Sequence, residues 1–344
     1  MPKPEIMSRR LPAEWEPQSA VQLTFPHVHS DWAPLLDRVI PCFVEIAEAV
    51  SRFQKVLVVC EDITTVKEYL KNIPEDRLIL TELPSNDTWA RDHGAITIED
   101  DGELTILDFI FNGWGLKFAA DKDNLISYRL FEKEIFKTNA LFKVGMVLEG
   151  GGIESDGKGV LMTTTSCQLS PNRNPHLSTD DVEENFRELF GTEKVLWLEN
   201  GYLAGDDTDS HIDTLARFCD ERTIAYVRCT DPSDEHYHAL AAMEEELKAF
   251  TDLDGQPYRL VPLPMADACY DDEGERIPAT YANFTIINGA VLVPTYGVPQ
   301  DTEALAILAG CFPGREIIGI NCFPLILQHG SLHCVTMQYP EGVI

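Results

Sequence analysis

A short module recurs along this chain and limits the folds that it can adopt. Each copy consists of two short runs of alternating apolar residues joined by a turn, and helical patterns lie between the copies. The turn signals stand at 101–102, 156–157, 219–222 and 288–289. They are about 55, 64 and 68 residues apart, and a period of this length marks repetition of one supersecondary unit. The repeat predicts an α/β fold assembled from copies of a hairpin with one or two helices.

The segments before and between the hairpins supply the expected helices. A strand at 21–25, a helix at 30–52, a strand at 55–60 and a helix at 64–71 open the chain, and further helices are expected at 124–138, 179–190, 233–250 and 301–311. If the strand near Val21 pairs with the last strand near Cys334, the array of modules closes on itself. Because no linker rich in Pro, Gly or Ser interrupts the pattern, we expect residues 1–344 to form a single domain.

Charge and composition limit the class of partner. The formal net charge is −30 and 44% of the residues are hydrophobic, so the chain can bury a large core while repelling nucleic acid and anionic membranes and attracting small cations. The nine cysteines are scattered without a Cys-x-x-Cys pair, which favours a reducing compartment. The chain shows no signal-peptide pattern and no apolar run of membrane-spanning length. We expect a cytoplasmic protein that binds a small cation, and a homodimer is compatible with this composition.

One acidic stretch places a histidine beside several carboxylates. From Ser210 onward the sequence alternates like a strand, so His211 and Asp213 are expected to share one face. Three more carboxylates come just before them, at Asp206, Asp207 and Asp209. Such a concentration of negative charge is costly unless a cation occupies it. That cation is either a metal ion or an organic substrate.

Further polar residues stand at matching positions of the other modules. Asp92 precedes the first hairpin, Glu149 the second, and His211 and Asp213 the third, while Cys334 lies in a short alternating run near the C-terminus. Equivalent positions of a closed repeat all face its axis, so these five side chains are expected to converge. Each one alone is an ordinary residue. Their recurrence at matched positions makes them candidate catalytic residues.

The motifs around these residues resemble those of a known enzyme family. They are Trp89-Ala-Arg-Asp92, Glu149-Gly-Gly-Gly, Asp206-Asp-Thr-Asp-x-His211-Ile-Asp213-x-x-Ala-Arg-Phe218 and Leu332-His-Cys334-Val-Thr-x-Gln338. Together they resemble the agmatine deiminases and the related bacterial-type peptidyl-arginine deiminases, over about residues 11–340. The resemblance implies a pentein fold, which is a five-bladed α/β propeller with pseudo-fivefold symmetry, and hydrolysis of a guanidine. Ser210 departs from the family, whose members usually have Gly there.

The residue types suit guanidine chemistry. Asp92 and Asp213 are expected to bind a planar guanidinium through charge-assisted hydrogen bonds. Cys334 would attack its carbon as a thiolate, and His211, oriented by Glu149, would protonate the departing ammonia and then activate water. With agmatine as substrate the product is N-carbamoylputrescine, a step toward putrescine, and no cofactor is expected.

The other end of the substrate distinguishes agmatine from arginine. Agmatine ends in an ammonium group, for which Asp207 is a suitable anion and Trp89 or Trp114 a suitable aromatic face. Arg91 and Arg217 are basic residues that could instead hold the carboxylate of arginine, although each alternates away from its catalytic neighbour.

Three alternatives stay open. The substrate could be another guanidine, such as free or peptidyl arginine, or the chain could be a non-catalytic polyamine-binding protein. His211 and Asp213 could also form a metal site with one of the other histidines, namely His27, His29, His329 or His333. A catalytic metal would leave Cys334 and the Asp92 motif unexplained, so the expected site contains none.

Overall fold

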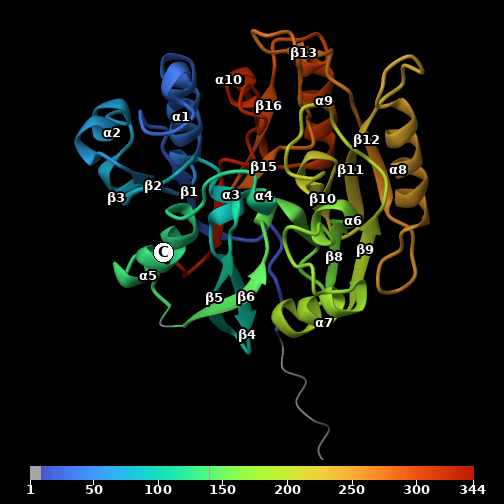
Figure 1. Cartoon of the computed structure of the whole chain (residues 1–344), viewed down its shortest axis with the longest axis horizontal. Coiled ribbons are helices and arrows are strands. Elements are labelled where there is room, and N and C mark those ends of the chain that lie inside the picture. Colours follow the sequence, from blue (N-terminus) through green and yellow to red (C-terminus); the bar gives the residue numbers. More distant parts are fainter. Residues whose placement is uncertain (1–8, 139) are drawn as a thin grey trace, which may run out of the picture.

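The structure is a computed structural model that describes residues 9–138 and 140–344. It is a mixed α/β fold (Figure 1). In the described part of the chain, five sheets share one arrangement, in which an antiparallel pair of strands is extended by a parallel strand. The repeat predicted from the sequence is therefore confirmed at the level of strand pairing.

The first of these sheets joins the two ends of the chain. Its order is β18-β1-β2-β3, with β1 at Gln18–Thr24, β2 at Lys55–Cys60, β3 at Leu78–Glu82 and β18 at Met337–Pro340. Strand β1 pairs antiparallel with β18, so that Val21 lies opposite Gln338, and parallel with β2. The expected pairing of the first strand with the last is confirmed.

The other four sheets follow along the chain. They consist of β4 (Ile96–Asp100), β5 (Glu103–Ile110) and β6 (Leu141–Val147); β7 (Ile153–Ser155), β8 (Val160–Thr164) and β9 (Lys194–Leu198); β10 (Ala216–Asp220), β11 (Thr223–Arg228) and β12 (Arg259–Pro264); and β15 (Thr285–Ile287), β16 (Ala290–Thr295) and β17 (Glu316–Asn321). A two-stranded sheet, β13 (Cys269–Tyr270) with β14 (Arg276–Ile277), precedes the last of them. All four predicted turns join the antiparallel strands.

Six helices of seven or more residues occur in the described part of the chain. They are α1 (Leu36–Ser51), α2 (Ile63–Tyr69), α5 (Ile126–Glu132), α7 (Thr179–Phe190), α8 (Tyr237–Ala249) and α9 (Asp301–Cys311). Figure 1 shows α1, α2, α7 and α8 at the periphery, and the one-turn helices α3 (Ala90–His93), α4 (Gly113–Leu116) and α6 (Thr165–Gln168) nearer the centre. A further short helix, α10, spans Phe323–Ile326, and 3₁₀ turns occur at Ala33–Leu35, Glu75–Arg77, Asp123–Leu125, Gly150–Gly152 and Ile212–Thr214.

Helix α7 shows why some boundaries could be predicted. A capping box between Ser178 and Asp181 fixes its start, and Gly191, in the left-handed conformation at φ 68°, ends it. Both α7 and α9 match the predicted ranges. The helix expected at 124–138 is wrong in extent, because α5 ends at Glu132 and Glu134 turns to a positive φ of 57°.

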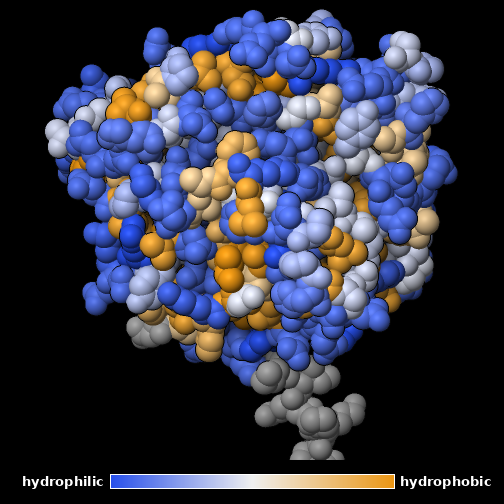
Figure 2. Space-filling view, in the orientation of Figure 1, coloured by the Kyte–Doolittle hydropathy of each residue, from blue (hydrophilic) through white to orange (hydrophobic). Residues whose placement is uncertain are grey.

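The surface and the core agree with the composition. The face in Figure 2 is largely hydrophilic, as expected for a strongly acidic chain. Inside, helix α1 packs on β2 and β17 and contributes Phe43, Ile46 and Val50, all fully buried, to the largest apolar cluster. No helix among the described residues is long and apolar enough to cross a bilayer.

Candidate active site

The predicted catalytic residues lie on turns and one-turn helices. Asp92 belongs to α3, and Glu149 immediately precedes the 3₁₀ turn Gly150–Gly152. His211 precedes the turn Ile212–Thr214, which contains Asp213, and Cys334 lies in a turn before β18. The backbone N–H of Arg91 donates to the carbonyl of Cys334 at 3.1 Å. This hydrogen bond joins the Asp92 segment to the Cys334 segment, although the two are far apart in the sequence.

The strands expected at His211 and Cys334 are not present. Asp209 and Ser210 have positive φ values of 67° and 62°, which end an extended conformation. The N–H of Thr214 then donates to the carbonyl of His211 at 3.2 Å, and the N–H of Thr336 donates to the carbonyl of His333 at 3.0 Å. Both bonds close a tight turn, so the polar and apolar alternation reflects turns and not strands.

His211 lies between two carboxylates at the centre of the site. Its Nδ1 is 3.7 Å from Asp92 Oδ1 and its Nε2 is 3.6 Å from Glu149 Oε2. The ring is fully buried, and neither nitrogen has a hydrogen-bond partner among the described residues. Burial lowers the pKa of His211, but Asp92, Cys167 and Glu149 outweigh it and raise the pKa well above the ordinary value. These neighbours therefore favour the protonated form of the imidazole.

Gly151 shows how closely the charged groups converge. A Cβ atom at this position would lie 2.7 Å from His211 Nδ1, 2.9 Å from Asp92 Oδ1 and 3.0 Å from Asp213 Oδ2. Instead, the N–H of Gly151 donates to Asp92 Oδ1 at 3.0 Å. The predicted convergence of Asp92, His211 and Asp213 is present around this one glycine.

Cys334 is buried beside acceptors. Its Sγ lies 3.4 Å from Asn283 Oδ1 and 3.9 Å from Asp213 Oδ2. Burial, with the nearby charges of Asp213 and Asp92, raises the pKa of Cys334 well above that of an ordinary thiol. Without a bound cation the sulfur is therefore a protonated thiol.

A narrow pocket connects this centre to the outside. It has a volume of about 110 Å³, and Cys334 and Asp92 contribute to its lining. The predicted substrate-binding residues Trp89, Trp114 and Asp207 all line it, together with Asp31, Asp87, Phe118, Thr208, Gln328, His329 and Gly330. Glu149, His211 and Asp213 do not line the pocket but lie behind it.

The aromatic and acidic groups of the pocket are held in place. Trp114 Nε1 donates to Asp92 Oδ2 at 2.9 Å, and the Trp89 and Trp114 rings pack edge to face with centroids 6.5 Å apart. Burial raises the pKa of Asp207 to about 6. Trp89 and Trp114 therefore form aromatic walls of the pocket, and Asp207 adds a carboxyl group that can ionise.

The family model of Porphyromonas-type peptidyl-arginine deiminases matches residues 10–340. The chain belongs to this family. It is similar to a Porphyromonas gingivalis protein provisionally named an arginine deiminase, with 58% identity, a TM-score of 0.94 and coverage of 98% of this chain and 100% of that one. The structure of a Cys-to-Ser variant of C. jejuni agmatine deiminase with substrate bound has 40% identity and a TM-score of 0.92, covering 98% of each chain. The agmatine deiminase of Pseudomonas aeruginosa (strain LESB58) is 30% identical over 96% of this chain and 95% of its own length. The resemblance seen in the motifs is confirmed.

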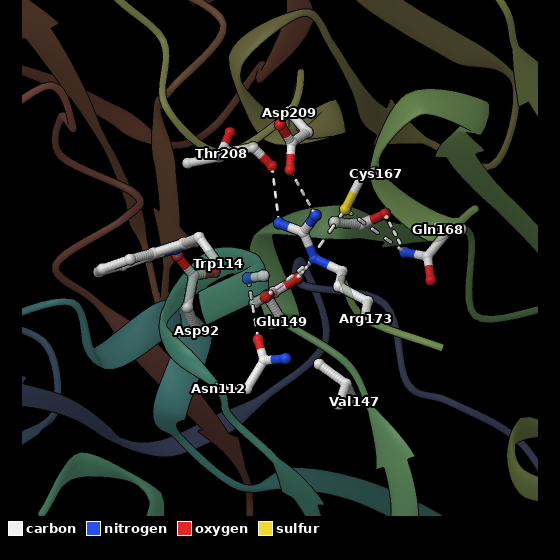
Figure 3. Close-up of polar contacts among 12 residues, drawn as sticks. Asp92, Asn112, Trp114, Val147, Glu149, Cys167, Gln168, Arg173, Thr208 and Asp209 are labelled. Atoms are coloured by element: carbon white, nitrogen blue, oxygen red, sulfur yellow. Dashed lines mark hydrogen bonds and ion pairs between the residues drawn. The ribbon is translucent and has the colours of Figure 1, made fainter. Parts of the chain in front are cut away.

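Arg173 supports this deiminase-family site but was not predicted. Its Nε donates to both oxygens of Glu149, at 2.7 and 3.0 Å, while Nη1 donates to Asp209 Oδ2 at 2.6 Å and Nη2 to the carbonyl of Thr208 at 2.8 Å (Figure 3). Burial raises the pKa of Glu149, but His211 and Arg173 outweigh it and lower the pKa overall. Arg173 stands in a loop without a recognisable motif, so only the structure links it to Glu149.

His333 and Asn283 support Asp213 from the far side. His333 Nδ1 lies 2.7 Å from Asp213 Oδ2 and its Nε2 lies 2.8 Å from Glu14 Oε2. Asn283 Nδ2 donates to the carbonyl of Asp213 at 3.2 Å, while its Oδ1 accepts from the N–H of His333 at 2.8 Å. Asp213 is therefore only partly free, since its Oδ1 alone lacks a hydrogen bond. His333 stands next to Cys334 in the sequence, and this position could have indicated that it belongs to the site. The sequence suggested it only as a metal ligand.

The two arginines that could have met a substrate carboxylate point elsewhere. Arg217 pairs with Glu14 at 2.7 Å and with Glu154 at 2.8 Å. Arg91 donates to the side chain of Gln338. Neither lines the pocket, so neither is placed to meet a substrate carboxylate there.

Two groups of metal-ligating side chains occur among residues 9–138 and 140–344. One is Glu149, Cys167 and His211, whose donor atoms lie within 4.8 Å of one another inside the site. The other, His27, His29 and Glu61, lies outside it. The grouping of His211 and Asp213 with another histidine does not occur in this described part, where His333 instead pairs with the carboxylates of Asp213 and Glu14.

Proposed function

We propose that this protein is an agmatine deiminase, which hydrolyses agmatine to N-carbamoylputrescine and ammonia through a covalent adduct on Cys334. The observation that carries this proposal is the position of a buried thiol in the lining of a narrow, aromatic-walled, acidic pocket, with the imidazole of His211 held between carboxylates behind it. Membership in the deiminase family and similarity to agmatine deiminases over nearly the whole chain support it.

Asp92 and Asp213 bind the guanidinium in this mechanism. Asp92 has its oxygens oriented by Trp114 and Gly151, and burial raises its pKa. Asp213 keeps one oxygen without a partner, and its pKa is lowered because the hydrogen bond and charge of His333 outweigh burial. A planar cation can donate to Asp213 Oδ1, which has no donor, and to the remaining lone pairs of the Asp92 carboxylate.

The bound cation activates the nucleophile. The same carboxylates that raise the pKa of Cys334 are neutralised by the guanidinium, so the thiol loses its proton to solvent when the substrate binds. The thiolate adds to the guanidinium carbon and forms a neutral tetrahedral adduct. His211 then donates its proton to the departing nitrogen, ammonia leaves, and an S-alkylthiouronium cation remains on Cys334.

Water completes the reaction. His211, now neutral, takes a proton from a water molecule whose oxygen adds to the thiouronium carbon. The C–S bond breaks and the sulfur leaves as thiolate. The added hydroxyl gives up its proton to solvent as the C=O bond of the ureido group forms, and Cys334 regains a proton once the product has left. Glu149, fixed by Arg173, keeps His211 oriented and stabilises its protonated form.

The outer part of the pocket favours an ammonium end over a carboxylate. Asp31, Asp87 and Asp207 contribute acid groups, whereas the lining residues include no lysine or arginine and only His329 as a basic group. An α-carboxylate would meet like charge there, and the ammonium of agmatine would meet opposite charge and the faces of Trp89 and Trp114.

The architecture proposed with this function is one catalytic domain over residues 1–344. We take the five similar sheets to be the blades of a pseudo-fivefold α/β propeller. The shared strand pattern and the β1–β18 pairing support this arrangement. No cofactor takes part in the proposed reaction.

Steady-state kinetics on agmatine, free arginine and a blocked arginine peptide test the substrate. Agmatine should have the highest kcat/KM, by at least about a hundredfold, because free arginine adds a carboxylate beside its ammonium and a blocked arginine peptide has no ammonium there. Arginine as the better substrate would contradict the assignment and would fit the name of the P. gingivalis relative. Binding of agmatine without ammonia release would indicate a polyamine-binding protein.

A further inference from the structure

Three donor side chains meet at the ends of two neighbouring strands, outside the pocket. His27 and His29 follow β1, and Glu61 follows β2, which pairs with β1 in parallel. His29 Nδ1 lies 2.7 Å from Glu61 Oε2, and His27 Nδ1 lies 3.4 Å from the same oxygen. The donor atoms of all three residues lie within 4.8 Å of one another.

The surroundings of His27 prepare it as a ligand. Its Nε2 lies 3.0 Å from Oγ of Ser85, whose side chain is fully buried, while its Nδ1 accepts the N–H of His29 at 3.1 Å. The proton therefore sits on Nε2, and Nδ1, the nitrogen without a proton, lies 3.4 Å from Glu61 Oε2. A hydrogen bond such as that between His27 Nε2 and Ser85 Oγ, made by the nitrogen that does not bind the metal, fixes the tautomer of metal-bound histidines.

We propose that His27, His29 and Glu61 form a binding site for Zn²⁺ or a similar first-row divalent cation. Both histidines bind through Nδ1 and Glu61 through Oε2, with water in the remaining position. Two imidazoles and one carboxylate suit zinc, nickel or copper, whereas magnesium and calcium prefer oxygen ligands. On metal binding the N–H of His29 gives up its bond to His27 Nδ1, and solvent can take its place because that bond is exposed.

An ion pair without metal explains less of this arrangement. A bond between His29 and Glu61 would account for those two side chains, but His29 is exposed, with a side-chain exposure of 70%. A solvated pair of this kind adds little stability. It also does not account for His27, whose Nδ1 lies 3.4 Å from the same carboxylate oxygen on a ring with a side-chain exposure of 8%.

The proposed metal site and the pocket share one chain segment. Asp31, two residues after His29, lines the pocket. Trp32 Nε1 donates to Asp87 Oδ1 at 2.8 Å, and the Trp32 ring packs against Trp89 with centroids 5.8 Å apart. A metal would connect this segment to β2 and should therefore stabilise the folded chain.

Zinc titration of the metal-free full-length protein tests the proposal. We expect one equivalent to bind and to raise the Tm, because a ligand that binds only the folded state stabilises it. His29→Ala removes an exposed ligand and should weaken zinc binding by more than about tenfold. Glu61→Gln keeps the side-chain shape and should weaken it similarly. His238→Ala, which removes an exposed histidine on α8, is the matched control and should bind zinc as the parent does.

Co²⁺ in place of zinc separates this site from Glu149, Cys167 and His211. At the proposed site the cobalt spectrum should lack a thiolate-to-metal band, and agmatine turnover without metal should be the same in His29→Ala as in the parent. The proposal is overturned if zinc does not bind, if His29→Ala and Glu61→Gln bind it like the parent, or if the cobalt spectrum shows thiolate ligation. None of these results depends on agmatine being the substrate.

Discussion

At the scale of single residues, Asp207 decides how the outer end of the pocket meets a charged substrate. Burial raises its pKa to about 6, while His329 acts in the opposite direction. The carboxyl is therefore ionised above about pH 6 and protonated below it. Only the ionised form can pair with the ammonium of agmatine.

Replacing Asp207 with Asn should raise the KM for agmatine by about one to two orders of magnitude, because a charged hydrogen bond of about 1.5–3 kcal/mol is lost. In the parent the KM should fall as the pH rises through about 6, since Asp207 loses its proton there. The KM of Asp207→Asn should not show this fall near pH 6. Steady-state kinetics measure both effects.

A guanidine whose chain ends in a methyl group is the control for this prediction. Its KM should change little in Asp207→Asn. If the variant loses affinity equally for both compounds, or keeps the parent KM for agmatine, Asp207 does not bind the ammonium.

The residues of the site differ in how far the sequence could predict them. Asp92, Glu149, His211, Asp213 and Cys334 stand in motifs, and the structure brings them together as expected; their catalytic roles stay predictions. Arg173 and Asn283 carry no such signal, because each acts through contacts with residues far along the chain, such as Glu149 and Asp213.

At the scale of elements, the site depends on turns in which a residue either approaches charged groups too closely for a side chain, as at Gly151, or has a positive φ, as at Asp209 and Ser210. The turn Gly150–Gly152 brings Gly151 against His211 and Asp92. The sequence could indicate hairpins and amphipathic helices, because their periodicity is local. It could not separate a short strand from a tight turn at 210–215 or 331–336, because the positive φ values of Asp209 and Ser210 are not visible in the pattern.

Gly151→Ala should lower kcat by more than about a hundredfold while leaving the fold intact. The added Cβ would lie 2.7 Å from His211 Nδ1, so the imidazole must move, and a shift of about 1 Å at a reacting group can cost this much. Turnover and circular dichroism measure the two effects.

Gly145→Ala is the matched control for this substitution. A Cβ at Gly145 would meet no atom within 4 Å, so its kcat should equal that of the parent. Parent-like turnover in Gly151→Ala would mean that the observed convergence around His211 is not needed for catalysis.

At the scale of the whole molecule, a net charge of −30 surrounds a pocket that takes a cation. Charges of one sign raise the local concentration of an oppositely charged ligand, and salt screens this effect over about 10 Å at 0.1 M. The end strands β1 and β18 pair, which is the condition that the sequence analysis set for closure of the repeat. Assembly as a homodimer stays a prediction.

Raising the ionic strength from about 0.02 to 0.5 M should increase the KM for agmatine severalfold and change kcat little, because screening acts on binding and not on the buried centre. Asp207→Asn should show a weaker dependence, since one attractive pair is absent. A KM that is independent of salt in the parent would show that the overall charge does not assist binding.

The covalent step on Cys334 is the central claim, and intact-mass spectrometry after rapid acid quenching tests it most directly. During turnover of agmatine, a fraction of the protein should gain the mass of agmatine less ammonia, and peptide mapping should locate the addition on Cys334. Cys334→Ser should show no addition and almost no turnover while still binding agmatine, because a hydroxyl is a far weaker nucleophile. An addition on another residue, or turnover by Cys334→Ser within tenfold of the parent, would contradict the account.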